Sequence, residues 1–281
     1  MIFSVAKLII IMAKGLRYGT FYVILKNNKK HKVVLNRAKK LNEKLIIFFV
    51  NKLYVLTGAG ISAESGIKTF RDSNGLWEEY DVMTVASIEG WHKNPQLVLK
   101  FYNERRKQLE NVKPNPAHTG LAELEKYFEV YIITQNVDDL HERAGSKNVL
   151  HLHGKLKEAC SSVNPSLIYD IGYKEIQWGD KCEKGSQLRP NIVWFGEAVP
   201  AFSEAIATIG DADAFAVIGT SLNVYPAAGL IDYVPVKVPA YLIDPNDIAQ
   251  TGRKIDFIKE KASVGVEILK KKLFEKFDIK I

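Results

Sequence analysis

Two histidines separated by one residue offer the clearest acid–base groups in the chain. His151 lies in the apolar run 149–152, and His153 follows that run directly before Gly154. Because side chains alternate along a strand, both imidazoles are expected on one face. His153, at the strand end, is the better candidate for a general base. A solvated or core histidine is the alternative for either residue, and a metal pair is disfavoured because no carboxylate or thiolate with ligand spacing accompanies them.

A second polar cluster follows the apolar run 130–134. Gln135, Asn136, Asp138 and Asp139 come there in close succession. Loops at the carboxyl ends of parallel strands face the ligand crevice of a doubly wound sheet. These side chains are therefore predicted to bind ribose hydroxyls and a carboxamide, with a helix cap at either aspartate as the structural alternative.

Glycine-rich turns follow two further apolar runs. The first reads Gly58-Ala59-Gly60-Ile61-Ser62-Ala63 and fits the pattern G-x-G-x-x-G/A, in which glycine lets a pyrophosphate approach the backbone at a helix N-terminus. The second reads Gly219-Thr220-Ser221. A strand-to-helix turn without a ligand is the alternative for the first, and a Walker loop is excluded because no Gly-Lys-Ser/Thr follows.

Short strands alternating with helices must position these clusters. Apolar runs predict strands at 53–56, 130–134, 149–152, 192–195, 214–218 and 240–243, and other patterns predict helices at 62–65, 94–110 and 117–126. Such alternation predicts an α/β fold with a Rossmann-like parallel sheet and helices on both faces. We divide the chain into an extension, 1–49, and a body, 50–275, with a helical insertion at about 72–120 and a smaller inserted domain at about 158–187.

Composition describes a globular protein with a substantial core. Of 281 residues, 47% are hydrophobic and 25% charged. A transmembrane span is disfavoured because no uncharged apolar run reaches ~18 residues, and two cysteines cannot staple a chain of this length. The net charge of +7 comes from the first 50 residues, which hold 11 basic residues and one acid, whereas the rest holds 28 basic and 31 acidic residues. The body therefore lacks the basic composition expected of a nucleic-acid-binding domain.

The status of residues 1–49 stays open. The segment mixes apolar patches with lysine-rich stretches. It is either a sequence upstream of a start near Val50, or a loosely packed extension, or a basic membrane-surface helix. A signal peptide is disfavoured because Lys7 and Lys14 bracket only six residues.

In order and combination, these motifs resemble the sirtuins, a family of NAD-dependent protein deacylases. The matching stretches are GAGISAESGIKTFR (58–71), TQNVDDLHERAG (134–145), HLHG (151–154), LRPNIVWFGE (188–197) and GTSLNVYPAA (219–228). They span residues 53 to about 265, and the first fifty residues have no counterpart in the family core. The resemblance implies the sirtuin fold, in which a Rossmann-like NAD domain and a smaller domain enclose NAD and an acyl-lysine peptide.

The resemblance also implies roles for individual residues. His153 is expected as the general base, and Asn136 joins it as a catalytic residue that also holds the nicotinamide ribose. The other residues expected to bind NAD are Gly58, Ala59, Gly60, Ser62, Phe70, Arg71, Gln135, Asp138, Gly219, Thr220, Ser221, Asn246 and Ala262. Val193, Phe195 and Gly196 are expected to pair with the substrate peptide as an added strand.

The implied reaction is lysine deacylation at the expense of NAD. The acyl oxygen attacks the anomeric carbon of the nicotinamide ribose, and nicotinamide leaves. His153 then removes a proton from a ribose hydroxyl, which attacks the acyl carbon. The products are free lysine, nicotinamide and O-acyl-ADP-ribose, and the protein supplies orientation and a dry site.

Two residues of the helix at 94–110 suggest the acyl group. Tyr102 and Arg105 are spaced i, i+3 and share a helix face. A phenol and a guanidinium beside a lysine channel would bind a carboxylate, and the subclass that removes succinyl and malonyl groups resembles this chain in its Tyr-x-x-Arg pair. Ala86 is a candidate for the small pocket residue of that subclass. An exposed arginine on a charged helix is the alternative, and acetyl-lysine also fits a wide pocket.

The cysteines depart from the family pattern. Most sirtuins hold a structural zinc with two Cys-x-x-Cys pairs, but this chain has only Cys160 and Cys182. Two thiolates do not complete a closed tetrahedral site. We therefore predict no zinc, and we expect the thiols to be buried, with a disulfide disfavoured in a reducing cytosol.

Two other functions share the same crevice. One is mono-ADP-ribosyl transfer or NAD hydrolysis, and the other is NAD sensing without turnover. The presence of Tyr102 and Arg105 disfavours the first, and the presence of His153 and Asn136 disfavours the second. A cytoplasmic location is expected, without nucleic-acid or membrane partners, and the sequence does not indicate protein substrates or an oligomeric state.

Overall fold

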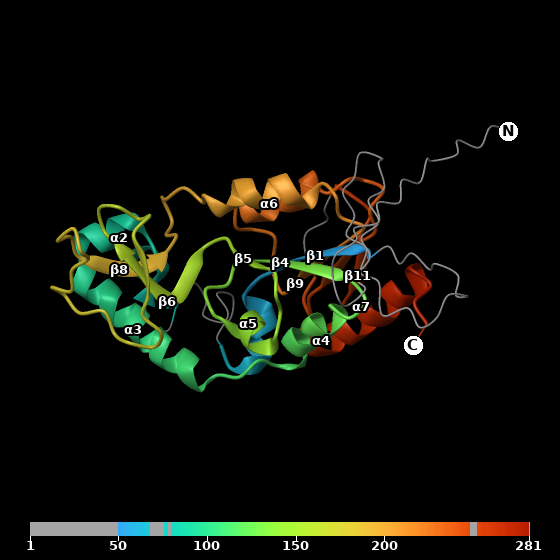
Figure 1. Ribbon diagram of the computed structural model, residues 1–281, viewed down its shortest axis with the longest axis horizontal. Coiled ribbons are helices and arrows are strands. Elements are labelled where there is room, and N and C mark those ends of the chain that lie inside the picture. Colours follow the sequence, from blue (N-terminus) through green and yellow to red (C-terminus); the bar gives the residue numbers. More distant parts are fainter. Residues whose placement is uncertain (1–49, 68–75, 78–79, 248–251, 281) are drawn as a thin grey trace, which may run out of the picture.

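A six-stranded parallel sheet runs through the centre of the protein (Figure 1). The computed structural model describes residues 50–67, 76–77, 80–247 and 252–280. The strands lie in the order β11-β10-β9-β1-β4-β5, and all neighbours are parallel. Their bounds are Lys52–Thr57 (β1), Glu129–Thr134 (β4), Val149–His151 (β5), Ala214–Ile218 (β9), Ala240–Ile243 (β10) and Asp256–Ile258 (β11).

The sheet register brings the strand ends together. Thr57 pairs with Thr134 of β4 and with Ile218 of β9, and Thr134 pairs in turn with His151. The strand order reverses at β1, which lies between β4 and β9. In doubly wound sheets, ligands bind outside the carboxyl ends of the strands at such a reversal. The glycine turn and the polar clusters are therefore neighbours at one edge.

Helices cover both faces of the sheet because its strands are apolar on both sides. Leu53 and Val55 face one core, with α4 (Pro116–Leu124) and α7 (Ala262–Lys276). Tyr54 and Leu56 face the opposite core, with α6 (Ala201–Ile209) and the 3-10 helix η2 (Ala227–Tyr233). Figure 1 shows α6 on one side of the sheet, and α4 and α7 on the other. This arrangement confirms the predicted α/β fold with a Rossmann-like sheet.

A smaller sheet and a group of helices form the other end of the molecule (Figure 1). The antiparallel strands lie in the order β7-β6-β8, with bounds Ile168–Asp170, Gly154–Ser161 and Leu188–Ile192. The neighbouring elements are β2 (Leu76–Trp77), β3 (Tyr80–Asp81), α1 (Val82–Val85), α2 (Ile88–Lys93) and α3 (Pro95–Asn111). A third apolar core joins α1, α2 and α3 to β6 and β8.

Most of the predicted elements agree with the structure. The runs at 214–218 and 240–243 form β9 and β10, and the helix predicted at 94–110 is α3. Asn94 caps α3, because its Oδ1 accepts a hydrogen bond from Leu97 N at 3.1 Å, and Pro95 begins the helix.

Two predicted elements differ in place or type. The strand predicted at 192–195 is wrong, because β8 ends at Ile192. Beyond it, Phe195 N donates to Ala86 O at 2.9 Å and makes only an isolated bridge with Ser87. The helix predicted at 62–65 is the 3-10 helix η1, Ala59–Ser65. In the described ranges, every helix is too short or too polar to cross a bilayer.

Candidate active site

The turns after β1 and β9 are in backbone contact. Gly60 N donates to Gly219 O at 2.8 Å, and Gly58 N donates to Ile218 O at 3.0 Å. A Cβ on Gly60 would lie 2.6 Å from Gly219 Cα, and one on Gly58 would lie 2.8 Å from Gly219 O. The glycines of the G-x-G pattern are therefore required by the packing of the two turns, in addition to any role toward a phosphate.

The Ser62 hydroxyl connects η1 to the loop after β4. Its Oγ donates to Asp138 Oδ2 at 2.9 Å and accepts from Asn136 Nδ2 at 3.1 Å. All three residues are buried. Burial raises the pKa of Asp138, while hydrogen bonds from Leu140 N and from Ser62 act in the opposite direction. Three of the predicted site residues thus form one hydrogen-bonded unit.

A histidine that the sequence did not single out lies behind this unit. His118 Nδ1 accepts from Asn115 N at 3.3 Å, so Nε2 carries the proton and faces Ser62 Oγ at 3.4 Å. Burial lowers the pKa of His118 to about 4. Asn115 Nδ2 also donates to Ile61 O at 2.7 Å. The available sequence signal was the Asn-Pro-x-His capping box that begins α4.

His153 has the tautomer that a general base requires. Its Nδ1 lies 3.0 Å from Gln135 O. A carbonyl only accepts, so Nδ1 carries the proton and Nε2 keeps its lone pair. Burial lowers the pKa of His153, and the bond to Gln135 opposes this shift. Gln135 Nε2 in turn donates to Thr220 Oγ1 at 3.1 Å and joins the loops after β4 and β9.

After β10, Asn246 is held by hydrogen bonds to the carboxylate of Asp244. Asp244 is 3% exposed, and its Oδ1 accepts from Asn246 N at 2.9 Å and from Asn246 Nδ2 at 3.3 Å. Asp244 was not predicted as a site residue, although it directly follows an apolar run. Ala262, at the start of α7, is buried, and Ser263 beside it donates N–H and O–H bonds of 2.9 and 2.6 Å to the Glu64 carboxylate of η1.

For four further predicted NAD-binding residues the structure gives only their burial or their coverage. Ala59 and Ser221 are half-buried on the two contacting turns. Phe70 and Arg71 lie outside the described residues.

The predicted acyl-binding pair lies on α3, at the end of the molecule that holds the smaller sheet. Tyr102 is 1% exposed, and its hydroxyl accepts a bond from Trp194 Nε1 at 3.0 Å. Burial raises the pKa of Tyr102, so the phenol keeps its proton. Arg105 is 8% exposed, and its guanidinium carbon lies 3.6 Å from the centre of the Phe101 ring. The alternative of a surface arginine is therefore wrong, because α3 turns this residue inward.

The segment expected to pair with a peptide runs between Ala86 and the end of β8. Ala86 is 5% exposed. Val193 N donates to His153 O at 3.0 Å. Phe195 is 43% exposed, and Gly196 has a φ of 90°. The structure thus places Val193 directly beside His153 and leaves the Phe195 ring accessible.

Both cysteines are buried free thiols. Cys160 Sγ lies 3.9 Å from Pro190 O, and Cys182 Sγ lies 3.0 Å from Ser186 Oγ. Where the family spacing would place the second thiolates, the chain has Val163 and Gly185. This donor set does not fit a tetrahedral zinc site. Within the described ranges no group of three or more metal-ligating side chains occurs, and the absence of zinc stays a prediction.

Comparison with known proteins identifies the family. Residues 58–226 match the Sir2 family model. A Bacteroides thetaiotaomicron protein named NAD-dependent protein deacylase is 56% identical over 230 residues, which cover 80% of this chain and 98% of the relative. A Helicobacter pylori protein of the same name is 54% identical over 227 residues, with coverages of 80% and 99%.

Solved structures agree with this assignment. A Sir2 homolog in complex with NAD is 39% identical, with a TM-score of 0.71, over 80% of this chain and 90% of that one. A Sir2 homologue variant with ADP-ribose is 38% identical, with a TM-score of 0.73, over 82% and 94% of the two chains. On its sequence, its fold and the arrangement of its site, the chain belongs to the Sir2 family.

Proposed function

We propose that this protein is an NAD-dependent protein-lysine deacylase that prefers acidic acyl groups, succinyl and malonyl, and also accepts acetyl. The deacylase activity is that named for the relatives from Bacteroides and Helicobacter. The acyl preference rests on one observation, the burial of Tyr102 and Arg105 side by side on α3.

The residues at the sheet edge fit NAD as co-substrate. When bound, NAD supplies the electrophilic anomeric carbon. The chain contributes a preorganised polar unit, because Ser62 fixes both the Asn136 amide and the Asp138 carboxyl before any ligand arrives. His153 offers the Nε2 lone pair as the base that takes a proton from a ribose hydroxyl.

The protonation states of Tyr102 and Arg105 support the acyl preference. The Tyr102 oxygen accepts the Trp194 N–H, so its own proton is directed elsewhere. The raised pKa of Tyr102 keeps that proton on the phenol. Arg105 carries a permanent positive charge in a buried place, where a charge-assisted bond to a carboxylate is strong. Ala86, whose side chain is a single methyl group, belongs to the same apolar core as Tyr102.

Matched peptides test the proposal. NAD-dependent lysine release from succinyl-, malonyl- and acetyl-peptides of one sequence is measured for the wild type, Arg105→Met and Lys107→Met. Lys107 is exposed on the same helix and serves as the charge-matched control. We expect Arg105→Met to lower kcat/KM for the succinyl peptide roughly 10- to 100-fold, as for a lost bond to a charged group. Acetyl turnover and the control stay within about threefold.

The outcomes separate the two parts of the proposal. If acetyl turnover dominates and Arg105→Met changes nothing, the acidic preference is wrong and the protein is a plain deacetylase. If no peptide turns over while NAD is hydrolysed, the deacylase assignment fails and NAD cleavage or ADP-ribosyl transfer replaces it.

A further inference from the structure

Both ring nitrogens of His151 make short contacts with oxygen atoms, whereas among the described residues only Nδ1 of His153 does. Its side chain is 3% exposed at the end of β5. Nδ1 lies 2.9 Å from the backbone oxygen of Asn136, and Nε2 lies 2.8 Å from Glu142 Oε1 of α5 (Leu140–Ala144). Both ring nitrogens are therefore in bonding contact with oxygen.

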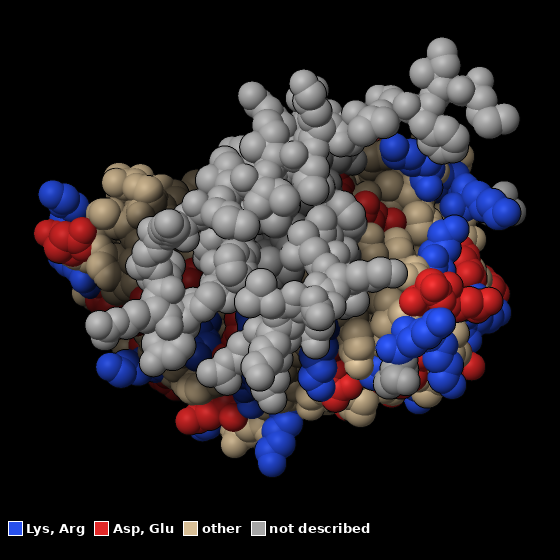
Figure 2. Space-filling model, turned by 45° about the vertical axis from the view of Figure 1, so that its right-hand side comes forward, with Lys and Arg blue, Asp and Glu red and all other residues tan. Residues whose placement is uncertain are grey.

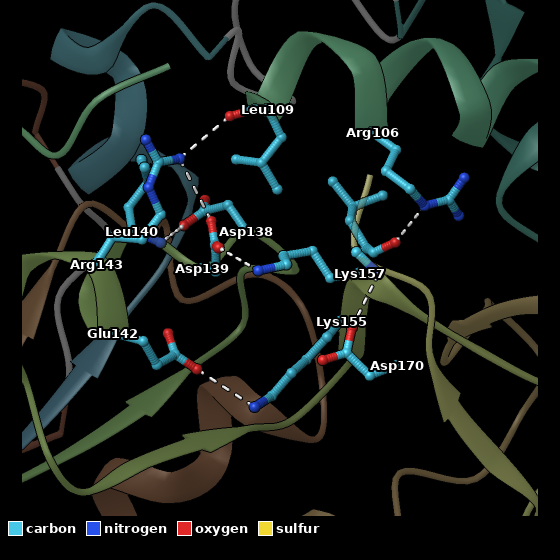
Figure 3. A network of polar contacts seen from close by, with 12 residues as sticks. Arg106, Leu109, Asp138, Asp139, Leu140, Glu142, Arg143, Lys155, Lys157 and Asp170 are labelled. Carbon is cyan, nitrogen blue, oxygen red and sulfur yellow. Dashed lines mark hydrogen bonds and ion pairs between the residues drawn. The ribbon is translucent and has the colours of Figure 1, made fainter. Parts of the chain in front are cut away.

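Both of these oxygens are acceptors. A backbone carbonyl has no proton to give. Partial burial would raise the pKa of Glu142, but the bond to His151 and the charges of His151 and Lys155 outweigh it and lower this pKa to about 2. Lys155 Nζ of β6 lies 3.3 Å from the same Oε1, and Figure 3 shows the two side chains pointing toward each other. Glu142 is thus a carboxylate at neutral pH.

A neutral imidazole has one N–H and would turn a lone pair toward one of these oxygens at under 3 Å. We propose that His151 is held as an imidazolium and acts as a positioning residue, fixing the Asn136 peptide to α5 through two N–H bonds. This inference rests on the proposed roles of Asn136 and His153 in the deacylase reaction.

The surrounding charges support a cation at this position. The ionisable groups around His151 include Asp138 in the loop after β4, His141 and Glu142 of α5, and Lys155 of β6, which shares Glu142 Oε1 with His151. Burial lowers the pKa of His141 well below its ordinary value, and the nearby histidines lower it further. His141 is therefore neutral at pH 7, and the Glu142 carboxylate supplies the negative charge that balances the His151 ring.

The proposed clamp completes the anchoring of Asn136. Its backbone N–H donates to Thr134 Oγ1 at 3.0 Å, and its side-chain Nδ2 donates to Ser62 Oγ at 3.1 Å. The bond from His151 holds its carbonyl. With all three groups fixed, the Asn136 side chain is held in one position for the reaction, which is worth much more to turnover than to substrate binding.

The two histidines thus receive opposite protonation states from similar surroundings. Each donates Nδ1–H to one of two consecutive carbonyls, Gln135 for His153 and Asn136 for His151. The difference is the carboxylate on the second nitrogen of His151. One ring keeps a lone pair for base chemistry, while the other uses both nitrogens for positioning.

Nitrogen NMR tests the charge directly. Ring nitrogens of the full-length, 15N-histidine-labelled protein are recorded near pH 7.5, and His151→Asn identifies the His151 signals by their loss. We expect both His151 nitrogens to be protonated and His153 to carry a proton on Nδ1 alone. A singly protonated His151 at this pH would overturn the proposal, and this readout is independent of whether any peptide is turned over.

Substitutions test the positioning role. In His151→Asn, the amide nitrogen can replace Nδ1 and keep the bond to Asn136, whereas His151→Gln reaches toward Glu142 and loses it. Because His151→Asn still loses the bond to Glu142, we expect kcat to fall roughly threefold for this variant and roughly tenfold or more for His151→Gln, with KM for the acyl peptide unchanged. Equal losses in kcat and in melting temperature for both variants would mean that His151 only stabilises the fold.

Glu142→Gln removes the cause of the charge. The side-chain amide of this variant can donate to a neutral His151 Nε2, so both contacts survive without an imidazolium. We expect His151 to become singly protonated near pH 7.5 while kcat stays close to that of the wild type. If His151 keeps both protons in Glu142→Gln, the carboxylate does not hold the charge and the proposal is wrong.

Discussion

The protonation of His153 has a consequence for the pH dependence of turnover. Burial lowers the pKa of this imidazole, so it remains a base at pH values where an exposed histidine is already charged. We expect the acidic limb of kcat/KM to lie below the ordinary imidazole value of about 6.5, and His153→Ala to lose about 100-fold or more in deacylation. A pH–rate profile and ADP-ribose binding by the variant check this, and an acidic limb at or above 6.5 would count against His153 as the base.

At Gly154, next in the chain, the backbone conformation and the neighbouring strand require a glycine. Its φ is 81°, and a Cβ there would overlap with the backbone oxygen of Asn191. We expect Gly154→Ala to cost roughly 3 kcal/mol or more of unfolding free energy, since both strain and a clash oppose it. Gly172 is the matched control, because its φ is 57° and a Cβ added to it would have no atom within 4 Å. Gly172→Ala should cost about 1 kcal/mol in the same urea titration, and equal losses would contradict the clash.

At the scale of elements, Asn103 joins α3 to the segment before β8. Its Nδ2 donates to Ile176 O and its Oδ1 accepts from Ile176 N, both at 3.0 Å, while Arg106 Nη1 donates to the same Oδ1 at 2.7 Å. We expect Asn103→Ala to lower stability by roughly 2–3 kcal/mol, because these buried partners lose their bonds. The exposed Glu104 pairs only with Lys100 at 3.9 Å among the described residues, so Glu104→Ala should change stability by less than about 0.5 kcal/mol. A similar loss in both variants, measured by urea unfolding, would show that Asn103 does not tie these elements together.

Elements with a strong local signal could be predicted from the sequence. β9 and β10 are continuous apolar runs, and α3 has a capping asparagine followed by proline. The strand predicted at 192–195 failed because Val193 and Phe195 make their backbone bonds with His153 and Ala86, which are distant in sequence. An apolar run does not by itself define a strand, because its backbone partners decide whether it joins a sheet.

The candidate site follows the same rule. Gln135, Asn136, Asp138 and His153 stand at strand ends, so sequence patterns found them. His118, Asp244 and Glu142 act through other residues, and only the fold brings them close. The contact of His151 Nε2 likewise comes from Glu142, nine residues away on another element.

For the whole molecule, buried histidines make stability depend on pH. His118 has a pKa lowered by burial to about 4, and those of His141 and His153 are lowered in the same way. The unfolded chain binds protons near pH 6.5 and the folded one does not, so stability falls as the pH drops from about 6.5 toward 4. We expect His118→Gln to reduce this dependence, measured as urea midpoints between pH 7.5 and 4.5. The exposed His92 on α2 is the control, and an equal effect of His92→Gln would contradict the assignment.

The surface of the described body carries both signs of charge. Figure 2 shows lysine, arginine, aspartate and glutamate side chains interspersed over the visible part of one face. This agrees with the balance of 28 basic and 31 acidic residues after residue 50. Long-range attraction of a strongly charged partner is therefore not expected from the body, and substrate choice falls to contacts at the site.

Strands β6 and β8 of the smaller sheet meet where β6 begins and β8 ends. Gly154 pairs with Ile192, and His153 O accepts from Val193 N at 3.0 Å. Backbone bonds close the two strands at this end. The sequence between β6 and β8 can therefore lengthen or shorten at little entropic cost, about 0.6 kcal/mol for each doubling of a flexible loop. His153, the proposed general base, lies at this closed end. Replacing the segment between β6 and β8 with that of a relative, or shortening it, would thus change this end of the molecule while the His153 imidazole keeps its place.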